Sequence, residues 1–324
     1  MPPAPTRGPA LLRHLYTLVV LALLALVLAN FGAAAALRRD GGYGLRIGQA
    51  YETDDFLLYR LKPRLRMARR VGEYERGLWG KTDATWAFST NSLGFRDFED
   101  FLLVHKPEGR LRILAVGDSH TFGLDVGNSS AYPARLQRRL NRNAGEKRFE
   151  VVNAGVPGYS SRQGLIYLTR ELGRLSPDMV ILQFGSNDAS RSANFLSMPE
   201  RRIPDRALFP DVRAPIPADL RMRIFWLDRY LLDAPLIRLL RRSRERTEDP
   251  DAEPRATAEE FRANLEAMKA WADEHGVKVV LLRVNLEPVY ADAVHRFARE
   301  AGVPLVNADE LFETRGADVL ASPL

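Results

Sequence analysis

The chain alternates between short apolar runs and segments whose apolar residues recur every three or four positions. The runs lie at residues 111–116, 149–152, 179–184, 277–284 and 303–306. Short runs rich in β-branched residues are typical of buried strands, and the spacing between them is typical of amphipathic helices. Strands joined by helical crossovers lie parallel. The pattern predicts an α/β fold with three layers, in which helices cover both faces of a doubly wound parallel sheet of five strands.

The helical segments also carry start and stop signals. Pro133 is placed to begin one helix, and Thr257-Ala-Glu-Glu260 is a capping box that begins another. Gly276 is suited to a left-handed cap at the end of that second helix. A further helix is predicted from the spacing of Leu165, Leu168, Leu172 and Leu175.

Polar motifs follow three of the predicted strands. They are Gly117-Asp-Ser-His120, Asn153-Ala-Gly155 and Gly185-Ser-Asn-Asp188. Since ligands of open α/β sheets bind at the carboxyl ends of the strands, these motifs should converge at one edge. A serine hydroxyl with a glycine N–H and an asparagine amide provides a nucleophile and two donors for attack on an ester carbonyl.

Each of these residues also has a simpler interpretation. Ser119 can be an ordinary turn serine, Gly155 can serve a tight turn, and Asn187 can cap a helix. Because all three motifs occur together, in order and after strands, we favour the catalytic interpretation.

The order of the motifs resembles the SGNH hydrolases, also called the GDSL esterase/lipase superfamily. The resemblance spans residues 85–320 and includes Thr90-Asn-Ser-Leu-Gly-Phe-Arg96, which is similar to a lead-in of membrane-anchored members. It implies that the predicted sheet is flavodoxin-like, that Ser119 is the nucleophile and that Gly155 and Asn187 are the oxyanion donors. It also implies an Asp-x-x-His block in the loop after the last strand.

The general base is the unresolved part of the predicted site. Asp292-Ala-Val-His295 spells Asp-x-x-His, but helical phase places both side chains opposite the apolar face, where a solvated ion-pair stripe is favoured. His120 adjoins Ser119, but neighbouring side chains on a turn generally point apart. We therefore expect the block to lie beyond Leu324 or to be absent. On this expectation the domain is incomplete at its carboxyl end, and a chain that stops at Leu324 is nearly inactive.

The amino-terminal segment has a different character. Leu15 to Leu37 is a run of 23 residues without a charge, long enough to span a bilayer. Arginines flank both ends, so charge does not decide the orientation. We favour a single-pass anchor through residues 15–37 with the catalytic domain outside the cytoplasm; the alternative is secretion after signal cleavage near Ala36.

The chain is thus expected to have three parts. Residues 1–37 form the anchor or signal segment, 38–110 form a connecting region of short strands and loops, and 111–324 form the hydrolase domain. Residues 189–256 interrupt the strand–helix rhythm as an insertion. We interpret it as a lid or substrate-recognition element, with simple packing on the core as the alternative.

Composition narrows the function further. The net charge of +6 comes from dispersed arginines, which argues against nucleic-acid binding, and the lack of cysteine excludes thiol chemistry. We find no metal or dinucleotide motif, so no cofactor is expected. The sequence predicts an exported esterase acting on an acyl ester of an envelope carbohydrate or a lipid. The alternatives are an O-acyltransferase acting on an extracytoplasmic polysaccharide and an inactive carbohydrate-binding protein of the same fold.

Overall fold

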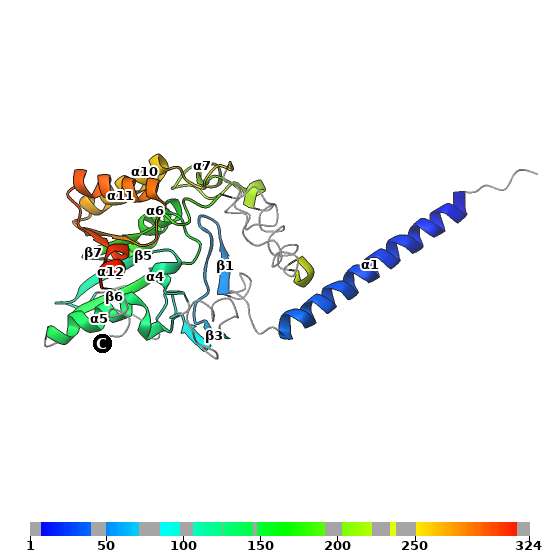
Figure 1. Ribbon diagram of the computed structural model, residues 1–324, viewed down its shortest axis with the longest axis horizontal. Coiled ribbons are helices and arrows are strands. Elements are labelled where there is room, and N and C mark those ends of the chain that lie inside the picture. The colour runs from blue at the N-terminus through cyan, green and yellow to red at the C-terminus, as the bar shows by residue number, and fades with distance from the viewer. Residues whose placement is uncertain are drawn as a thin grey trace, which may run out of the picture.

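A computed structural model of the 324-residue chain describes residues 8–39, 50–70, 85–97, 106–124, 126–144, 148–191, 203–221, 234–237 and 251–315. Its centre is a five-stranded parallel sheet (Figure 1). The strands are β5 (Leu111–Gly117), β6 (Phe149–Gly155), β7 (Met179–Gln183), β8 (Lys278–Arg283) and β9 (Leu305–Asn307). The predicted α/β fold with five parallel strands is confirmed.

The spatial order of the strands is β6-β5-β7-β8-β9, with all neighbours parallel. Numbered along the chain from β5, this is the order 2-1-3-4-5 of flavodoxin-like folds. The connections reverse direction across the sheet beside β5, and in open α/β sheets the crevice at such a point is where ligands bind. The sheet order therefore directs attention to the loops that follow β5, β6 and β7.

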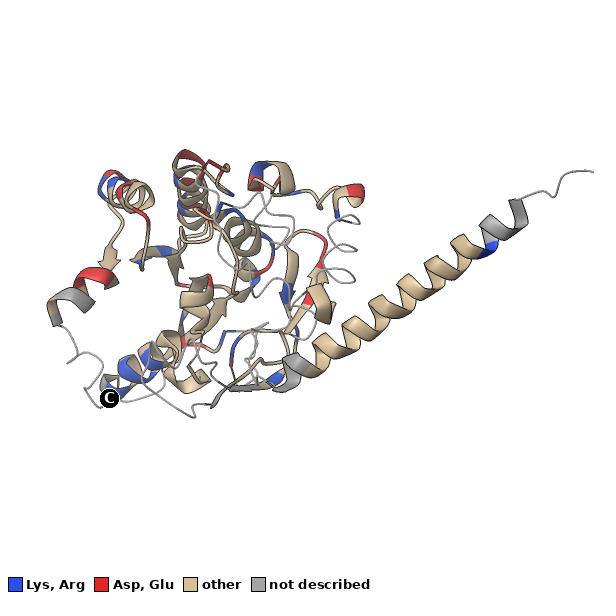
Figure 2. Ribbon diagram, turned by 45° about the vertical axis from the view of Figure 1, so that its right-hand side comes forward, with Lys and Arg blue, Asp and Glu red and all other residues tan. Residues whose placement is uncertain are grey.

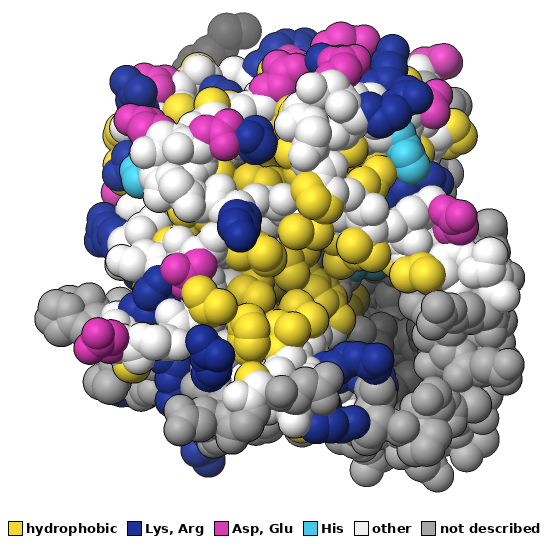
Figure 3. Space-filling view, turned by 90° about the vertical axis from the view of Figure 1, so that its left-hand side faces the viewer, with side chains coloured by type: hydrophobic (Ala, Val, Ile, Leu, Met, Phe, Trp, Pro, Cys, Tyr) yellow, Lys and Arg dark blue, Asp and Glu magenta, His cyan; other side chains and the backbone are white. Residues whose placement is uncertain are grey.

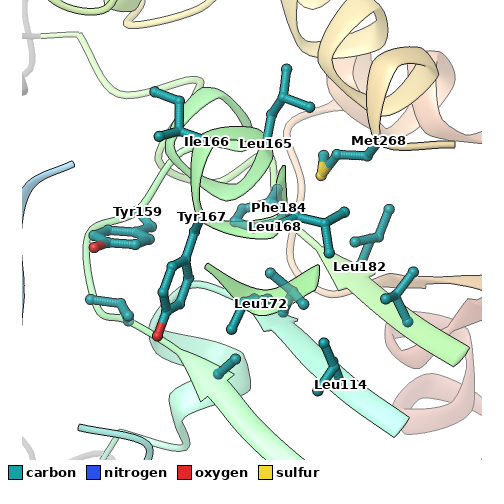
Figure 4. Close-up of a cluster of buried hydrophobic side chains, with 14 of the residues drawn as sticks. Leu114, Tyr159, Leu165, Ile166, Tyr167, Leu168, Leu172, Leu182, Phe184 and Met268 are labelled. Carbon is teal, nitrogen blue, oxygen red and sulfur yellow. The ribbon is translucent and has the colours of Figure 1, made fainter. Parts of the chain in front are cut away.

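One face of the sheet is covered by three helices, α6 (Ser161–Arg170), α10 (Ala258–Glu274) and α11 (Pro288–Glu300). Figure 4 shows the cluster that they form with the strands, in which Leu168 and Met268 meet Leu114 and Leu182. Ser160 and Thr257 form capping boxes at the starts of α6 and α10. The amphipathic spacing and the caps thus explain why these segments are helical and which side they bury.

The other face is covered by α5 (Tyr132–Asn143), which packs on Ile113, Val151 and Ile181. Toward the far edge of the sheet the cover becomes thinner among the described residues, and Val306 of β9 is 42% exposed. Figure 3, viewed from the left of Figure 1, shows apolar side chains gathered on this side of the molecule. Helices on both faces give the three layers that the pattern predicts.

The predicted helix through Leu165 and Leu175 differs in one respect. It ends at Arg170, and a 3₁₀ turn, η2 (Leu172–Leu175), follows. Glycine is a poor helix former, and a Cβ on Gly173 would lie 2.8 Å from the Trp271 ring. The 3₁₀ turn therefore keeps Leu172 and Leu175 buried and lets α10 approach closely.

The segment between α1 and β5 contains short strands. In its described part, β1 (Tyr51–Asp54) pairs antiparallel with β2 (Leu58–Leu61), and β3 (Arg66–Arg70) pairs with β4 (Thr85–Ser89).

The other short elements are α4 (Ser119–Phe122), η1 (Asn128–Ser130), α7 (Asp205–Leu208) and α12 (Ala308–Arg315). Much of the predicted insertion at 189–256 lies outside the described residues.

The amino-terminal helix α1 (Gly8–Arg39) extends away from the α/β body in Figure 1. Its stretch Arg13–Ala35 has a mean hydropathy of 2.5, and 6% of the residues that set this value are buried. Figure 2 shows its middle without charged residues. A buried core helix of a soluble protein is therefore a poor description, and a membrane anchor and a signal sequence both fit.

Gly164 provides a test of the packing between α6 and the sheet. An exchange of glycine for alanine normally stabilises a helix, but a Cβ here would lie 2.2 Å from the Phe184 ring. We expect Gly164→Ala to lower the free energy of unfolding by about 1–3 kcal/mol, the usual cost of overpacking. Thermal unfolding measures this, with Gly32→Ala as the matched control because nothing lies within 4 Å of that Cβ position. Equal stability of both variants would contradict the described packing.

Candidate active site

The three predicted site residues lie at the carboxyl edge of adjacent strands. Ser119 begins α4 directly after β5, Gly155 ends β6, and Asn187 lies in the turn after β7. The register places Gly117 of β5 opposite Gly155 on one side and opposite Gln183 of β7 on the other. Ser119 is half-buried, whereas Asn187 is buried. The fold therefore brings together a hydroxyl, a backbone N–H and a side-chain amide.

The carboxylate of Asp118 joins two of these motifs. It is fully buried, and its Oδ1 accepts the backbone N–H of His120 at 2.8 Å, which caps the amino terminus of α4. Its Oδ2 accepts a hydrogen bond from Asn187 Nδ2 at 3.3 Å. One side chain thus fixes the start of the Ser119 helix and the direction of the Asn187 amide.

Gln183, at the end of β7, holds the same turn from beneath. Its Oε1 accepts hydrogen bonds from the Thr121 N–H at 3.2 Å and the Thr121 hydroxyl at 3.0 Å. It also lies 3.4 Å from the backbone nitrogen of Asp118. The first turn of α4 is therefore tied to β7 through backbone groups on both sides of Ser119.

Two glycines permit this close arrangement. A Cβ on Gly155 would lie 2.2 Å from the backbone nitrogen of Phe122, and one on Gly117 would lie 2.6 Å from the carbonyl oxygen of Gln183. Backbone atoms cannot yield as the tip of a side chain can. No larger residue therefore fits between β6 and α4, or between β5 and β7, without displacing the loop that carries Ser119.

Both predicted donors are hydrogen-bonded within the protein. Gly155 donates its N–H to Asn153 Oδ1 at 3.1 Å. Asn187 donates from Nδ2 to the Tyr159 carbonyl at 3.1 Å as well as to Asp118. An incoming oxyanion would have to share these donors with their present acceptors.

His120 lies closer to the site chemistry than its sequence position suggests. Its ring nitrogen Nδ1 lies 3.0 Å from Asp118 Oδ1, and this hydrogen bond raises the pKa of His120 above its ordinary value. Burial acts in the opposite direction, while the charges of Asp118 and Asp309 raise the pKa further. Asp309 belongs to α12, so the loop after β9 also reaches this edge of the sheet.

His295 is not bonded to Asp292. Its ring is half-buried, and its Nε2 accepts a hydrogen bond from Arg283 Nη1 at 2.9 Å, whereas Asp292 is exposed. Arg283 also lies 3.3 Å from Asp309 in an ion pair. The prediction that His295 belongs to a solvated stripe of ion pairs with Asp292 is therefore wrong. The His295 ring turns toward the end of β8 and is bonded to Arg283 instead.

Two further buried carboxylates hold the loops around the site. Asp188 accepts the N–H groups of Ser161 and Gly185 at 3.1 Å, and burial raises its pKa to about 7. Asp205 pairs with Arg255 at 3.1 Å, with both side chains almost fully buried. These contacts join the start of α6 to the loop after β7 and to the described part of the insertion. Within the described ranges, no cluster of three His, Asp or Glu side chains is arranged to hold a metal ion.

Comparison with known proteins agrees with the motifs. The model of the GDSL-like lipase/acylhydrolase family matches residues 115–289, which is more than half of the chain. The chain therefore belongs to this family, and the predicted family membership is confirmed.

Two curated relatives match part of the chain. Esterase TesA of Pseudomonas aeruginosa is 37% identical over 79 residues, which cover 24% of this chain and 38% of TesA. The thioesterase 1/protease 1/lysophospholipase L1 of Escherichia coli K12 is 32% identical over 90 residues, covering 28% of this chain and 41% of that protein. The chain thus matches less than half of the length of these relatives.

Solved structures that match part of the chain include the lipase/acylhydrolase from Enterococcus faecalis. It shares 20% sequence identity over 64% of this chain and 80% of that one, with a TM-score of 0.39. The crystal structure of TesA shares 21% identity over 60% of this chain and 76% of that one, with a TM-score of 0.37.

Proposed function

We propose that this protein is a serine ester hydrolase in which Ser119 is the nucleophile. The observation that carries the proposal is the meeting of Ser119, Gly155 and Asn187 at one sheet edge, in a chain of the lipase/acylhydrolase family. Relatives named as an esterase and as a thioesterase and lysophospholipase support ester or thioester substrates.

The chemistry follows from the positions of the groups. The Ser119 hydroxyl attacks the acyl carbon, and the carbonyl oxygen becomes an oxyanion that the Gly155 N–H and the Asn187 amide can bind. Collapse of the tetrahedral intermediate expels the alcohol and leaves an acyl-enzyme, which water then cleaves to release the acid.

Proton transfer from Ser119 requires a base, and the family resemblance assigns that role to the Asp-x-x-His block. The two described histidines nearest this sheet edge have other partners, since Asp118 holds His120 and Arg283 holds His295. We assign neither of them as the base. If a sugar hydroxyl replaces water in the second step, the same site becomes an acyltransferase.

Labelling with a fluorophosphonate tests the nucleophile. The probe phosphonylates only an activated serine, so we expect it to label the native protein in its own membranes and to leave Ser119→Ala unlabelled. Ser161→Ala is a matched control, because the buried Ser161 hydroxyl donates to Asp188 and accepts a hydrogen bond from Asn264. Undiminished labelling of Ser119→Ala would reject the proposal.

Replacement of Asn187 tests the oxyanion donor. Asn187→Ala is expected to lower kcat for p-nitrophenyl acetate by a factor of about 10²–10³, the usual cost of one such donor. KM should change little, because the donor acts mainly on the transition state. Asn187→Asp keeps the size but replaces the donor with a negative charge, and it should be at least as inactive. Full activity of Asn187→Ala would remove Asn187 from the site.

We also propose that α1 holds the protein in a membrane, with the α/β body on the extracytoplasmic side. The apolar stretch Arg13–Ala35 supports this placement. It would bring the site near envelope carbohydrate or lipid, and we propose esters of these classes as substrates.

The placement is tested by protease treatment of spheroplasts. We expect a protease added outside to digest the α/β body, because an exported body is not protected by the membrane. A fusion of residues 38–324 to a cytoplasmic carrier is the control that should resist until lysis. Resistance of the full chain until lysis would place the body in the cytoplasm.

A further inference from the structure

The helix that begins with Ser119 is too short to support itself. α4 has four residues, and one turn of helix costs more backbone entropy than its hydrogen bonds return. Its amino end is fixed by the Asp118 cap, but the carbonyl groups at its carboxyl end have no intrahelical partners. The position of Ser119 therefore depends on what holds that carboxyl end.

The guanidinium of Arg96 binds these carbonyl groups. Nη1 donates to the carbonyl oxygens of Phe122 and Gly123, and Nη2 donates to that of Val126. The guanidinium also lies over the Phe122 ring, 4.4 Å from its centroid. The side chain is buried, and its burial lowers the pKa of Arg96 to about 10. A planar fork with several donors in fixed directions suits this arrangement of acceptors, and a lysine ammonium does not.

Arg96 is itself held by Asn128 of η1, which is hydrogen-bonded to Ser89 of β4. Its Nε donates to Asn128 Oδ1 at 3.2 Å, and the same oxygen accepts the Ser89 N–H at 3.2 Å. Asn128 Nδ2 donates back to the carbonyl and hydroxyl oxygens of Ser89, at 3.1 and 2.9 Å. The guanidinium is thus fixed between the end of β4 and the loop that follows α4.

The turn that precedes Arg96 is equally constrained. Asn91 Oδ1 accepts the N–H groups of Leu93 and Phe95 at 3.0 and 3.1 Å. Gly94 has φ +86°, and a Cβ there would lie 2.6 Å from the Leu61 carbonyl oxygen. The motif Thr90–Arg96 therefore forms a compact turn that delivers Arg96 in one direction.

The same network extends to the second predicted donor. The Phe122 carbonyl that accepts from Arg96 also accepts from Asn153 Nδ2 at 3.3 Å, and Asn153 Oδ1 accepts the Gly155 N–H at 3.1 Å. The backbone N–H of Arg96 donates to the Asn153 carbonyl at 3.3 Å. One residue therefore contacts both the end of the Ser119 helix and the strand that presents Gly155.

We propose that Arg96 is a positioning residue, which keeps Ser119 and the Gly155 N–H at the mutual distance that the reaction needs. The inference rests on the proposed function, since it concerns the same nucleophile and the same donor. Arg96 lies outside residues 115–289, the part of the chain that the family model matches. The segment before β5 thereby acquires a role in the site rather than being only a connection to α1.

The test compares three variants of the full-length protein. Arg96→Met removes the guanidinium, and Arg96→Lys keeps the charge but not the fork. Arg112→Met is the matched control, because Arg112 is also fully buried, with Nε on Glu150 at 2.8 Å and Nη1 on the Leu175 carbonyl. It lies near the amino end of β5, at the opposite end of the strand from Ser119.

The first measurement is amide hydrogen exchange, which does not depend on activity. Phe122, Gly123 and Leu124 donate their N–H groups to Asp118 and Ser119. We expect amide exchange in a peptide covering residues 118–124 to be faster in both Arg96 variants than in the wild type. The increase should be smaller for Arg96→Lys than for Arg96→Met, and exchange in β8 should not change. Arg112→Met should leave this peptide at the wild-type rate. Wild-type exchange of this peptide in both Arg96 variants would overturn the inference.

The second measurement is kinetic. A displacement of the nucleophile by even one ångström is costly, so kcat for Arg96→Met should fall by about 10- to 100-fold with little change in KM, and lysine should restore part of it. Arg112→Met should lose thermal stability but keep its kcat. If Arg96→Met fails to fold, the lysine variant carries both measurements.

The two proposals can fail separately. An unlabelled wild-type protein would reject Ser119 as an activated nucleophile, while the exchange data would still decide whether Arg96 orders α4. A labelled wild-type protein with unchanged kcat in both Arg96 variants would reject the positioning role alone.

Discussion

The buried carboxylate of Asp118 is the group on which the candidate site depends most. It lies where β5 ends, and it accepts hydrogen bonds from the His120 N–H at the start of α4 and from the amide of Asn187. A buried charge is stable only when hydrogen bonds replace its lost hydration, so the surrounding donors are required for folding as well as for function. The same constraint fixes the distance between the loop after β5 and the loop after β7, which no backbone hydrogen bond of the sheet could fix.

Around this carboxylate the site is assembled under tight steric limits. Gly117 is the residue at which β5 comes within backbone contact of β7, and Gly155 is the residue at which β6 does so with α4; neither can carry a side chain there. The switch in strand order supplies the opening, and the glycines let a helix start inside it. Arg96 then holds the far end of that helix from a separate part of the chain. The geometry of Ser119 is therefore determined by contacts at both ends of one helical turn.

The sequence predicts the elements well because their signals are local. The five strands, the capping box at Thr257 and the positive φ of Gly276 all follow from residues a few positions apart. The convergence of Ser119, Gly155 and Asn187 follows from strand order and needs no side-chain detail.

Contacts that a side chain makes with groups far away in the sequence could not be predicted in the same way. Hydrogen bonds such as that of Arg96 with the Phe122 carbonyl, 26 positions away, leave no periodic trace in the sequence. His295 is a second example. Helical phase predicts the face of the helix on which its ring lies, but it does not predict the hydrogen bond that Arg283 donates to that ring from β8. The sequence predicts that the His120 side chain points away from Ser119. Its hydrogen bond with Asp118 at 3.0 Å depends on a cap geometry that residue spacing alone does not specify.

The hydrogen bonds that already occupy the donors bear on how the proposed site would work. Gly155 donates to the Asn153 amide oxygen at 3.1 Å. Asn187 donates to the Tyr159 carbonyl at 3.1 Å and to the Asp118 carboxylate at 3.3 Å, so both groups are oriented before a substrate arrives. A ground-state ester carbonyl is a weak acceptor and gains little by competing for them. A tetrahedral oxyanion is a much stronger one, because charge-assisted hydrogen bonds are about twice as strong as neutral ones. We infer that the neutral acceptor of the Gly155 N–H makes this donor selective for the transition state, which is the condition for catalysis rather than for mere binding. The ordered acceptor Asn153 would then matter to the rate without touching the substrate.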